Sequence, residues 1–137
     1  MTGVVSGTIE CANWKEQTLE TIEGVSKLTR ASAQNAYGGA MEAESTVEYL
    51  MFYSDPSTAQ FTGFEHVRGR LGGKSGGFVL LHVGTFRDGR SETTLTVLTG
   101  SGTGELVGLN GAGTATWNGQ HWHASCYSLE YDFTSAD

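Results

Sequence analysis

Two short turn motifs constrain the fold of this chain more than any other feature of its sequence. Asp88-Gly89 and Asn118-Gly119 each lie between runs that are typical of β-strands. Both central residues of a two-residue type I′ turn need a positive φ, which Asn, Asp and Gly adopt most easily. The motifs therefore predict tight β-hairpins. Gly72-Gly73 is a weaker candidate of the same kind, and Asp55-Pro56-Ser57 ends a further strand-like run.

Runs rich in Val, Thr, Tyr and Phe predict about eight strands. They are expected at 3–11, 19–31, 36–54 (with a break at Gly38-Gly39 as an alternative), 58–70, 74–86, 90–99, 111–117 and 120–134. Helical turns are expected only around Trp14-Lys15-Glu16 and at 101–109. Successive hairpins leave two exposed sheet edges, and closure removes both. We therefore predict an all-β fold: a closed antiparallel eight-stranded up-and-down barrel with one or two short helical turns.

Size and charge narrow the function classes. The chain has 137 residues, so we expect residues 1–137 to form a single β-barrel domain. Its net charge of −7 has the wrong sign for a protein that grips nucleic-acid phosphates. The first residues lack the basic and apolar regions of a signal peptide, and no stretch approaches the roughly 18 apolar residues that span a membrane. We therefore expect a cytoplasmic protein with neither nucleic acid nor membrane as a partner.

The hairpin at Asp88-Gly89 predicts which residues share a face. A two-residue loop there pairs His82 with Leu95, because loop length sets strand register. The opposite face of this hairpin is more polar, so the inner face is expected to hold Phe78, Leu80, His82 and Leu95.

The register extends to the preceding strand if Gly72-Gly73 is also a two-residue loop. Phe61, Glu65 and Val67 then face inward. Glu65 lies diagonal to His82 on the neighbouring strand, within side-chain reach. A carboxylate beside an imidazole in an apolar enclosure is a general acid–base pair, because burial raises the pKa of the carboxyl and the ion pair opposes that shift. Glu65 and His82 are the candidate catalytic residues; the alternative is a structural polar pair in a packed barrel.

The run 120–134 has the clearest alternation of apolar and polar residues. Its inner face is expected to hold His123, Tyr127 and Tyr131. The two tyrosines would either orient a ligand through their hydroxyls or serve as core aromatics bonded to neighbours. His121 and His123 have the spacing of metal ligands on a strand, but no further ligand has a readable spacing, so no metal site is expected.

The sequence does not decide which face of the run 36–54 is buried, nor whether the two cysteines pair. In the run 36–54, a four-residue loop would send the even-numbered side chains from Glu48 to Phe52 inward, whereas a slip of one residue would send those from Tyr49 to Tyr53. Cys11 and Cys126 match no metal or redox spacing, and nothing requires them to pair.

Several segments together resemble an uncharacterised bacterial family, the domain of unknown function 3224. They are the glycine-rich motifs at 69–85 and 100–111, the closing segment 123–131, Gly63-Phe64-Glu65 and Trp14-Lys15-Glu16. The resemblance covers nearly the whole chain. It implies a closed barrel akin to that of plant allene oxide cyclase. It carries no catalytic residues, because the family has no assigned activity.

These patterns favour a protein that binds a small, mostly apolar or amphipathic molecule in the barrel without a cofactor. Besides Glu65 and His82, the expected lining is Phe61, Val67, Phe78, Leu80, Leu95, His123, Tyr127 and Tyr131. One alternative is a cofactor-independent isomerase, cyclase or hydro-lyase that moves protons through Glu65 and His82. Another is a filled barrel with a structural or interaction role, in which Trp117 and Trp122, expected on the outer face, form the contact of a homo-oligomer.

Overall fold

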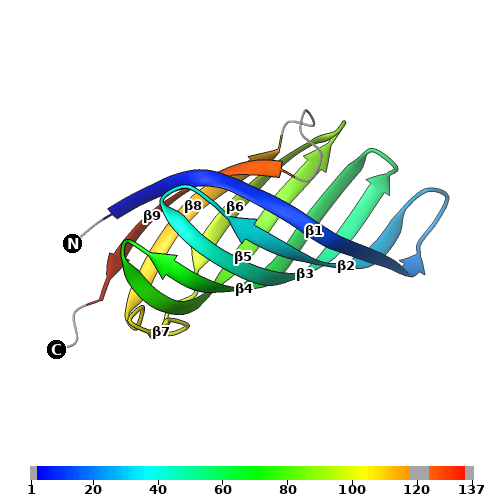
Figure 1. The fold of residues 1–137 in the computed structure, drawn as a ribbon. Helices are drawn as coiled ribbons and strands as arrows, with labels where there is room; N and C mark the ends of the chain where they lie inside the picture. The colour runs from blue at the N-terminus through cyan, green and yellow to red at the C-terminus, as the bar shows by residue number, and fades with distance from the viewer. Residues whose placement is uncertain (1–2, 118–123, 135–137) are drawn as a thin grey trace.

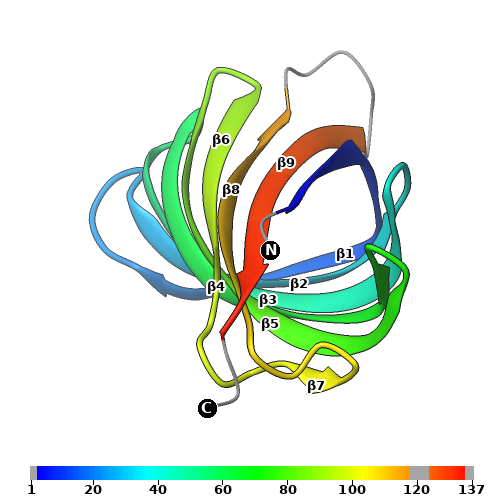
Figure 2. The same ribbon diagram turned by 90° about the vertical axis from the view of Figure 1, so that its left-hand side faces the viewer.

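The chain forms one antiparallel sheet that closes on itself. The computed structural model describes residues 3–117 and 124–134, which contain strands and turns but no helix (Figure 1). The strands are β1 (Gly3–Thr21), β2 (Lys27–Tyr37), β3 (Met41–Asp55), β4 (Thr58–Leu71), β5 (Lys74–Arg87), β6 (Arg90–Val97), β7 (Thr103–Gly104), β8 (Leu109–Trp117) and β9 (Ala124–Phe133). Their order is β4-β3-β2-β1-β9-β8-β6-β5-β7, and β4 also pairs with β5. The eight longer strands therefore form a ring (Figure 2). No helix of the described chain is long and apolar enough to cross a membrane.

Two of the predicted hairpins are confirmed, together with their register. Asp88-Gly89 joins β5 to β6 with φ values of 51° and 78°, and Gly72-Gly73 joins β4 to β5 with 59° and 82°. These positive angles are the ones that two-residue hairpin loops require. His82 lies opposite Leu95 on β6, as predicted, and opposite Gly63 on β4, which places Glu65 diagonal to it as expected. Asn118-Gly119 lies outside the described residues.

The prediction for the N-terminal strands was wrong. The first strand does not end at residue 11, and Trp14-Lys15-Glu16, predicted to be helical, lies within β1. A register shift between Ala12 and Lys15, with Asn13 at a φ of 57°, bulges the strand without ending it. From Ala12 onward β1 is exposed and pairs only with β2, so it lacks the alternation that marks a strand with one buried face.

The boundaries of the next strands also differ from the predicted ones. The second strand is β2 at 27–37 instead of 19–31, and the break at Gly38-Gly39 separates it from β3. A register shift between Tyr53 and Asp55 gives the one-residue slip, so Tyr49, Met51 and Tyr53 face inward. The second segment predicted to be helical, 101–109, is the two-residue β7 followed by turns.

The two ends of the ring are packed differently. Near the Gly72-Gly73 turn, a large cluster of buried apolar side chains fills the interior, with Phe78, Leu80 and Leu95 among its members. Toward the opposite end the buried cluster contains only Ala31, Met51 and Ala59, with Tyr49, Tyr53, Phe61 and Phe86 packed partly against it. Glu65 lies between these two clusters on β4, since Phe61 packs against the smaller cluster and Val67 belongs to the larger one.

Trp117 does not lie on the outer face, so that prediction was wrong. It pairs with Ser91, in the row next to buried Thr93 and Ala115, and its ring stacks on Phe86 with centroids 6.3 Å apart. The β6–β8 register therefore directs Trp117 into the ring. Trp122 lies outside the described residues.

Candidate functional site

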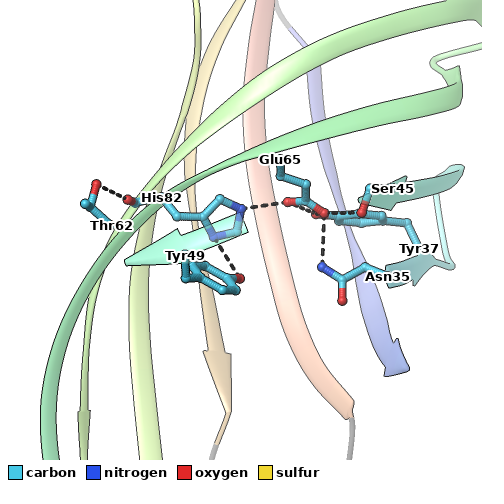
Figure 3. A network of polar contacts seen from close by, with 7 residues as sticks. All are labelled: Asn35, Tyr37, Ser45, Tyr49, Thr62, Glu65 and His82. Carbon is cyan, nitrogen blue, oxygen red and sulfur yellow. Dashed lines mark hydrogen bonds and ion pairs between the residues drawn. The ribbon is translucent and has the colours of Figure 1, made fainter. Parts of the chain in front are cut away.

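Glu65 on β4 carries a fully buried carboxylate in the middle of the ring (Figure 3). The hydroxyl of Tyr37 is 2.7 Å from both of its oxygens, and the amide nitrogen of Asn35 is 3.1 Å from Oε2. The hydroxyl of Ser45 also donates to Oε2. On the other side, Nε2 of His82 lies 2.6 Å from Oε1. Four side chains thus compensate for the water that the carboxylate has lost.

The surroundings of Glu65 hold it in the ionised form. Burial acts to raise the pKa of the carboxyl, but the hydrogen bond and the charge of His82, with the hydroxyls of Ser45 and Tyr37, outweigh burial and lower it. Burial and the charge of Glu65 together raise the pKa of Tyr37 well above its usual range. Tyr37 therefore stays protonated and acts as a hydrogen-bond donor to Glu65.

A row of three residues across β3, β4 and β5 brings Tyr49 to His82. Gly63 lies opposite Tyr49 on one side and opposite His82 on the other. Because Gly63 has no side chain, the two rings meet over it, with centroids 5.4 Å apart and planes at 81°. The hydroxyl of Tyr49 lies 3.4 Å from Nδ1 of His82 (Figure 3). The His82 ring therefore contacts Glu65 through one nitrogen and Tyr49 through the other.

A pocket of about 340 Å³ occupies the less packed half of the ring. Its walls are mainly apolar and include six large aromatic side chains: Trp14, Tyr49, Tyr53, Phe61, Phe86 and Trp117. Cys11, Asn35 and His82 also border it, whereas Glu65 does not. No Asp, Glu, Lys or Arg side chain is among the described residues that line it. Glu65 can therefore reach the contents of this pocket by hydrogen bonds only through His82 or Asn35, although its charge also acts on the pocket residues Tyr49 and Cys11.

Glu16 organises one side of the pocket. Its carboxylate accepts hydrogen bonds from Nε1 of Trp14 at 3.1 Å, the hydroxyl of Tyr53 at 2.7 Å and the hydroxyl of Thr29 at 2.7 Å. Trp14 and Tyr53 both line the pocket, and the Trp14 ring lies 6.0 Å from that of Tyr49. The exposed half of β1 thus contributes a wall through the bulge that precedes Trp14.

The described residues contain no metal-binding cluster. Among residues 3–117 and 124–134, no three His, Cys, Asp or Glu side chains come together in a way that could hold an ion. Cys11 is half-buried, Cys126 is exposed, and neither forms a disulfide. His121 and His123 lie outside the described residues.

The family was identified by comparison with known proteins. A family model described as a protein of unknown function (DUF3224) matches residues 5–131. The chain belongs to this family. The crystal structure of a DUF3224 protein of unknown function from Shewanella oneidensis MR-1 is similar to it, with 28% identity and a TM-score of 0.76 over 98% of this chain and 100% of that chain. No curated protein matches the chain significantly.

The predicted site residues of this DUF3224 chain fall into two groups. Phe61 and His82 line the pocket, and Glu65 contacts His82 from outside it. The others that the structure describes belong to the large packed cluster or pack against it: Val67, Phe78, Leu80, Leu95, Tyr127 and Tyr131. Tyr127 has the role of a core aromatic, since its hydroxyl donates to the carbonyl of Gly38 at 3.1 Å. His123 lies outside the described residues.

Most of the residues that surround Glu65 and the pocket in this DUF3224 chain were not predicted from the sequence. Asn35, Tyr37 and Ser45 were not among the candidates, although each is a polar or amphipathic residue at an inward position of β2 or β3. Tyr49 was present only as one of two alternatives for the run 36–54. They could have been found from the alternation of apolar and polar residues in the segments on both sides of the Gly38-Gly39 turn, which places every second residue, including Tyr37, on the inner face.

Proposed function

We propose that this chain is a small-molecule-binding β-barrel that takes a mostly apolar ligand into the pocket in the less packed half of its interior. The observation that carries the proposal is the chemistry of the lining. A mainly apolar lining with six aromatic side chains surrounds about 340 Å³, and the hydroxyl of Tyr49 meets the ring of His82 in its wall. Pockets for small molecules have this size and this mixture of apolar walls with a few placed polar groups.

The packing supports this proposal over the filled-barrel alternative. One half of the interior holds a dense apolar cluster, whereas the other half is lined by large side chains that leave room between them. A cytoplasmic location, a homo-oligomer and a relation to the allene oxide cyclase barrel remain predictions from the sequence.

A neutral fluorophore such as phenylnaphthylamine tests the proposal. The protein should raise its fluorescence on binding, and Ala33→Phe should weaken that binding by about tenfold or more, because Ala33 is buried and borders the pocket. Ala36→Phe is the matched control, since Ala36 is exposed on the outer face of the same strand. Binding that is equal in the wild type and Ala33→Phe, or no binding by the wild type, would contradict the proposal.

A second candidate function is proton transfer on a bound molecule, as in a cofactor-independent isomerase, cyclase or hydro-lyase. It is favoured by one observation: His82 lines the pocket and at the same time contacts the buried Glu65 at 2.6 Å. His82, with a hydrogen on both ring nitrogens, would touch the substrate oxygen as a proton donor, Glu65 would be a positioning residue, and the carbon-bound proton would leave to water.

Exchange of carbon-bound hydrogen tests this second function. In deuterated water, the methyl group of bound acetonaphthone should exchange faster with the protein than in buffer, and His82→Gln should remove the acceleration. An exchange rate equal to that in buffer would exclude proton transfer on this class of ketone.

A further inference from the structure

We propose that the hydroxyl of Tyr49, hydrogen-bonded to the His82 ring, holds the polar end of the ligand, so that the pocket selects neutral apolar molecules with a carbonyl oxygen and rejects carboxylates. This inference rests on the proposed binding function and adds the ligand class. It follows from three properties of the site. The first is the hydrogen on Nε2 of His82, the second is the hydrogen bond between Nδ1 of His82 and the Tyr49 hydroxyl, and the third is the lack of a free positive charge in the pocket lining.

The first property is the direction of the hydrogen bond between His82 and Glu65. Tyr37, Asn35 and Ser45 all donate to the carboxylate, which is fully buried and ionised. A carboxylate only accepts, so the hydrogen of this bond sits on Nε2 of His82. An ionised carboxylate without solvent also needs a compensating positive charge, and His82 is the group in contact with Glu65 that can supply it.

The second property is the direction of the hydrogen bond between His82 and Tyr49. A positively charged ring carries a hydrogen on Nδ1 as well, and this hydrogen points to the Tyr49 oxygen at 3.4 Å. Burial and the charge of Glu65 raise the pKa of Tyr49 well above its usual range, so its hydroxyl stays protonated. With its oxygen engaged by His82, the hydroxyl hydrogen of Tyr49 is directed to an acceptor in the pocket.

The third property is the absence of a positive charge that a carboxylate could use. The described lining has no Lys or Arg, and the one ring that can carry a positive charge is already paired with Glu65. A second carboxylate at the Tyr49 end would lose its water and lie near the charge of Glu65. A ketone or aldehyde oxygen accepts the Tyr49 hydrogen bond without this cost.

The groups around His82 come from several strands. Glu65 on β4 and Tyr49 on β3 contact its ring nitrogens, and Phe61 and Leu95 are apolar neighbours on β4 and β6. Cys11 on β1 also borders the pocket, and burial, followed by the charge of Glu65, raises the pKa of its thiol. The Cys11 thiol is therefore neutral and adds no charge at neutral pH.

Three naphthalene compounds of matched shape test the inference: acetonaphthone as the ketone, ethylnaphthalene as the hydrocarbon and naphthoate as the acid. Their affinities for the wild type, Tyr49→Phe and Tyr53→Phe are measured by calorimetry. Tyr49→Phe should weaken acetonaphthone by about three- to tenfold, the range for one neutral hydrogen bond, and leave ethylnaphthalene unchanged. Naphthoate should bind the wild type more weakly than acetonaphthone does.

Tyr53→Phe is the matched control. Tyr53 lines the same pocket, but its hydroxyl is bonded to Glu16 at 2.7 Å. Its substitution should leave the affinities for the ketone and the hydrocarbon in the same ratio as in the wild type. An equal loss of ketone affinity in both variants would overturn the assignment to Tyr49.

The outcomes separate this inference from the proposed function. If the hydrocarbon binds and Tyr49→Phe does not affect the ketone, or if naphthoate binds best, the inference fails and the binding function stands. If none of the three binds the wild type, both fail.

The infrared carbonyl stretch of bound acetonaphthone gives an independent result that does not depend on the folding of a variant. In the wild type it should lie at lower frequency than in an alkane solvent, because a hydrogen bond weakens the carbonyl bond. An unshifted stretch in the bound state would overturn the inference.

Discussion

Replacing Glu65 with Gln should lower the free energy of unfolding by about 3 kcal/mol at neutral pH. The substitution keeps the size of the side chain and removes its charge and one of its two acceptors. The amide oxygen can retain the three donors at the Oε2 position, which come from Asn35, Tyr37 and Ser45. A hydrogen bond to a charged group contributes about 1 kcal/mol more than one to a neutral group, so three such bonds lose about 3 kcal/mol together. The amide nitrogen of the substituted residue faces Nε2 of His82 and can donate to it once the ring is neutral, so this fourth contact is kept.

The same substitution should change the pH dependence of stability. Because the pKa of Glu65 in the folded state lies below its ordinary value of 4.5, its contribution is fully present above that pH and disappears as the pH falls through the folded-state pKa. The difference between the wild type and Glu65→Gln should therefore shrink in acid. Urea unfolding followed by circular dichroism, from neutral pH to about pH 3, measures both effects.

Glu48→Gln is the control for a charge removed at the surface. Glu48 is more than half exposed and forms an ion pair with Arg30 at 3.0 Å, which contributes less than about 1 kcal/mol. A loss of stability in Glu65→Gln no larger than that in Glu48→Gln would refute the stabilising role of the Glu65 charge. This role is also refuted if the difference from the wild type stays constant down to about pH 3.

A substitution at Gly63 and chemical labelling of Cys11 provide two further tests of the site. Gly63→Ala should cost about 1–3 kcal/mol in urea unfolding, because its Cβ would lie 2.2 Å from a backbone oxygen of β3 and 2.8 Å from the Tyr49 ring, whereas Gly38→Ala has room and should be nearly neutral. A neutral thiol reagent should label the half-buried Cys11 more slowly than the exposed Cys126, since burial raises the pKa of the Cys11 thiol. A bound apolar fluorophore should slow Cys11 alone, and equal protection of both thiols would argue against binding in the pocket.

The part of the site that depends on tight turns could be predicted from the sequence. Asp88-Gly89 and Gly72-Gly73 set the register of three consecutive strands, and this register placed Glu65 within reach of His82. The prediction succeeded because a two-residue loop has few backbone solutions, so a local motif determines pairings along the whole hairpin.

The rest of the site depends on features that local patterns do not resolve. Tyr49 faces inward because of an irregularity between Tyr53 and Asp55, and a one-residue slip reverses every side chain of a strand. Trp14 reaches the pocket through a bulge in a half-paired strand, which alternation cannot predict. The prediction of Trp117 on the outer face was wrong for a related reason, since the direction of its side chain follows from the pairing of β8 with β6.

The seam where β1 pairs with β9 has a consequence for circular permutation of the chain. Gly3 lies opposite Tyr131 there, whereas the other seams of the ring join strands that are consecutive apart from the short β7 (Figure 2). A circular permutant that links the two ends and opens the Asp88-Gly89 turn would keep every strand pairing. It would turn the β1–β9 seam into a local hairpin and make β5–β6 the long-range contact. The pairing with the largest sequence separation, which has the highest entropic cost of closure, would then involve the strand that carries His82.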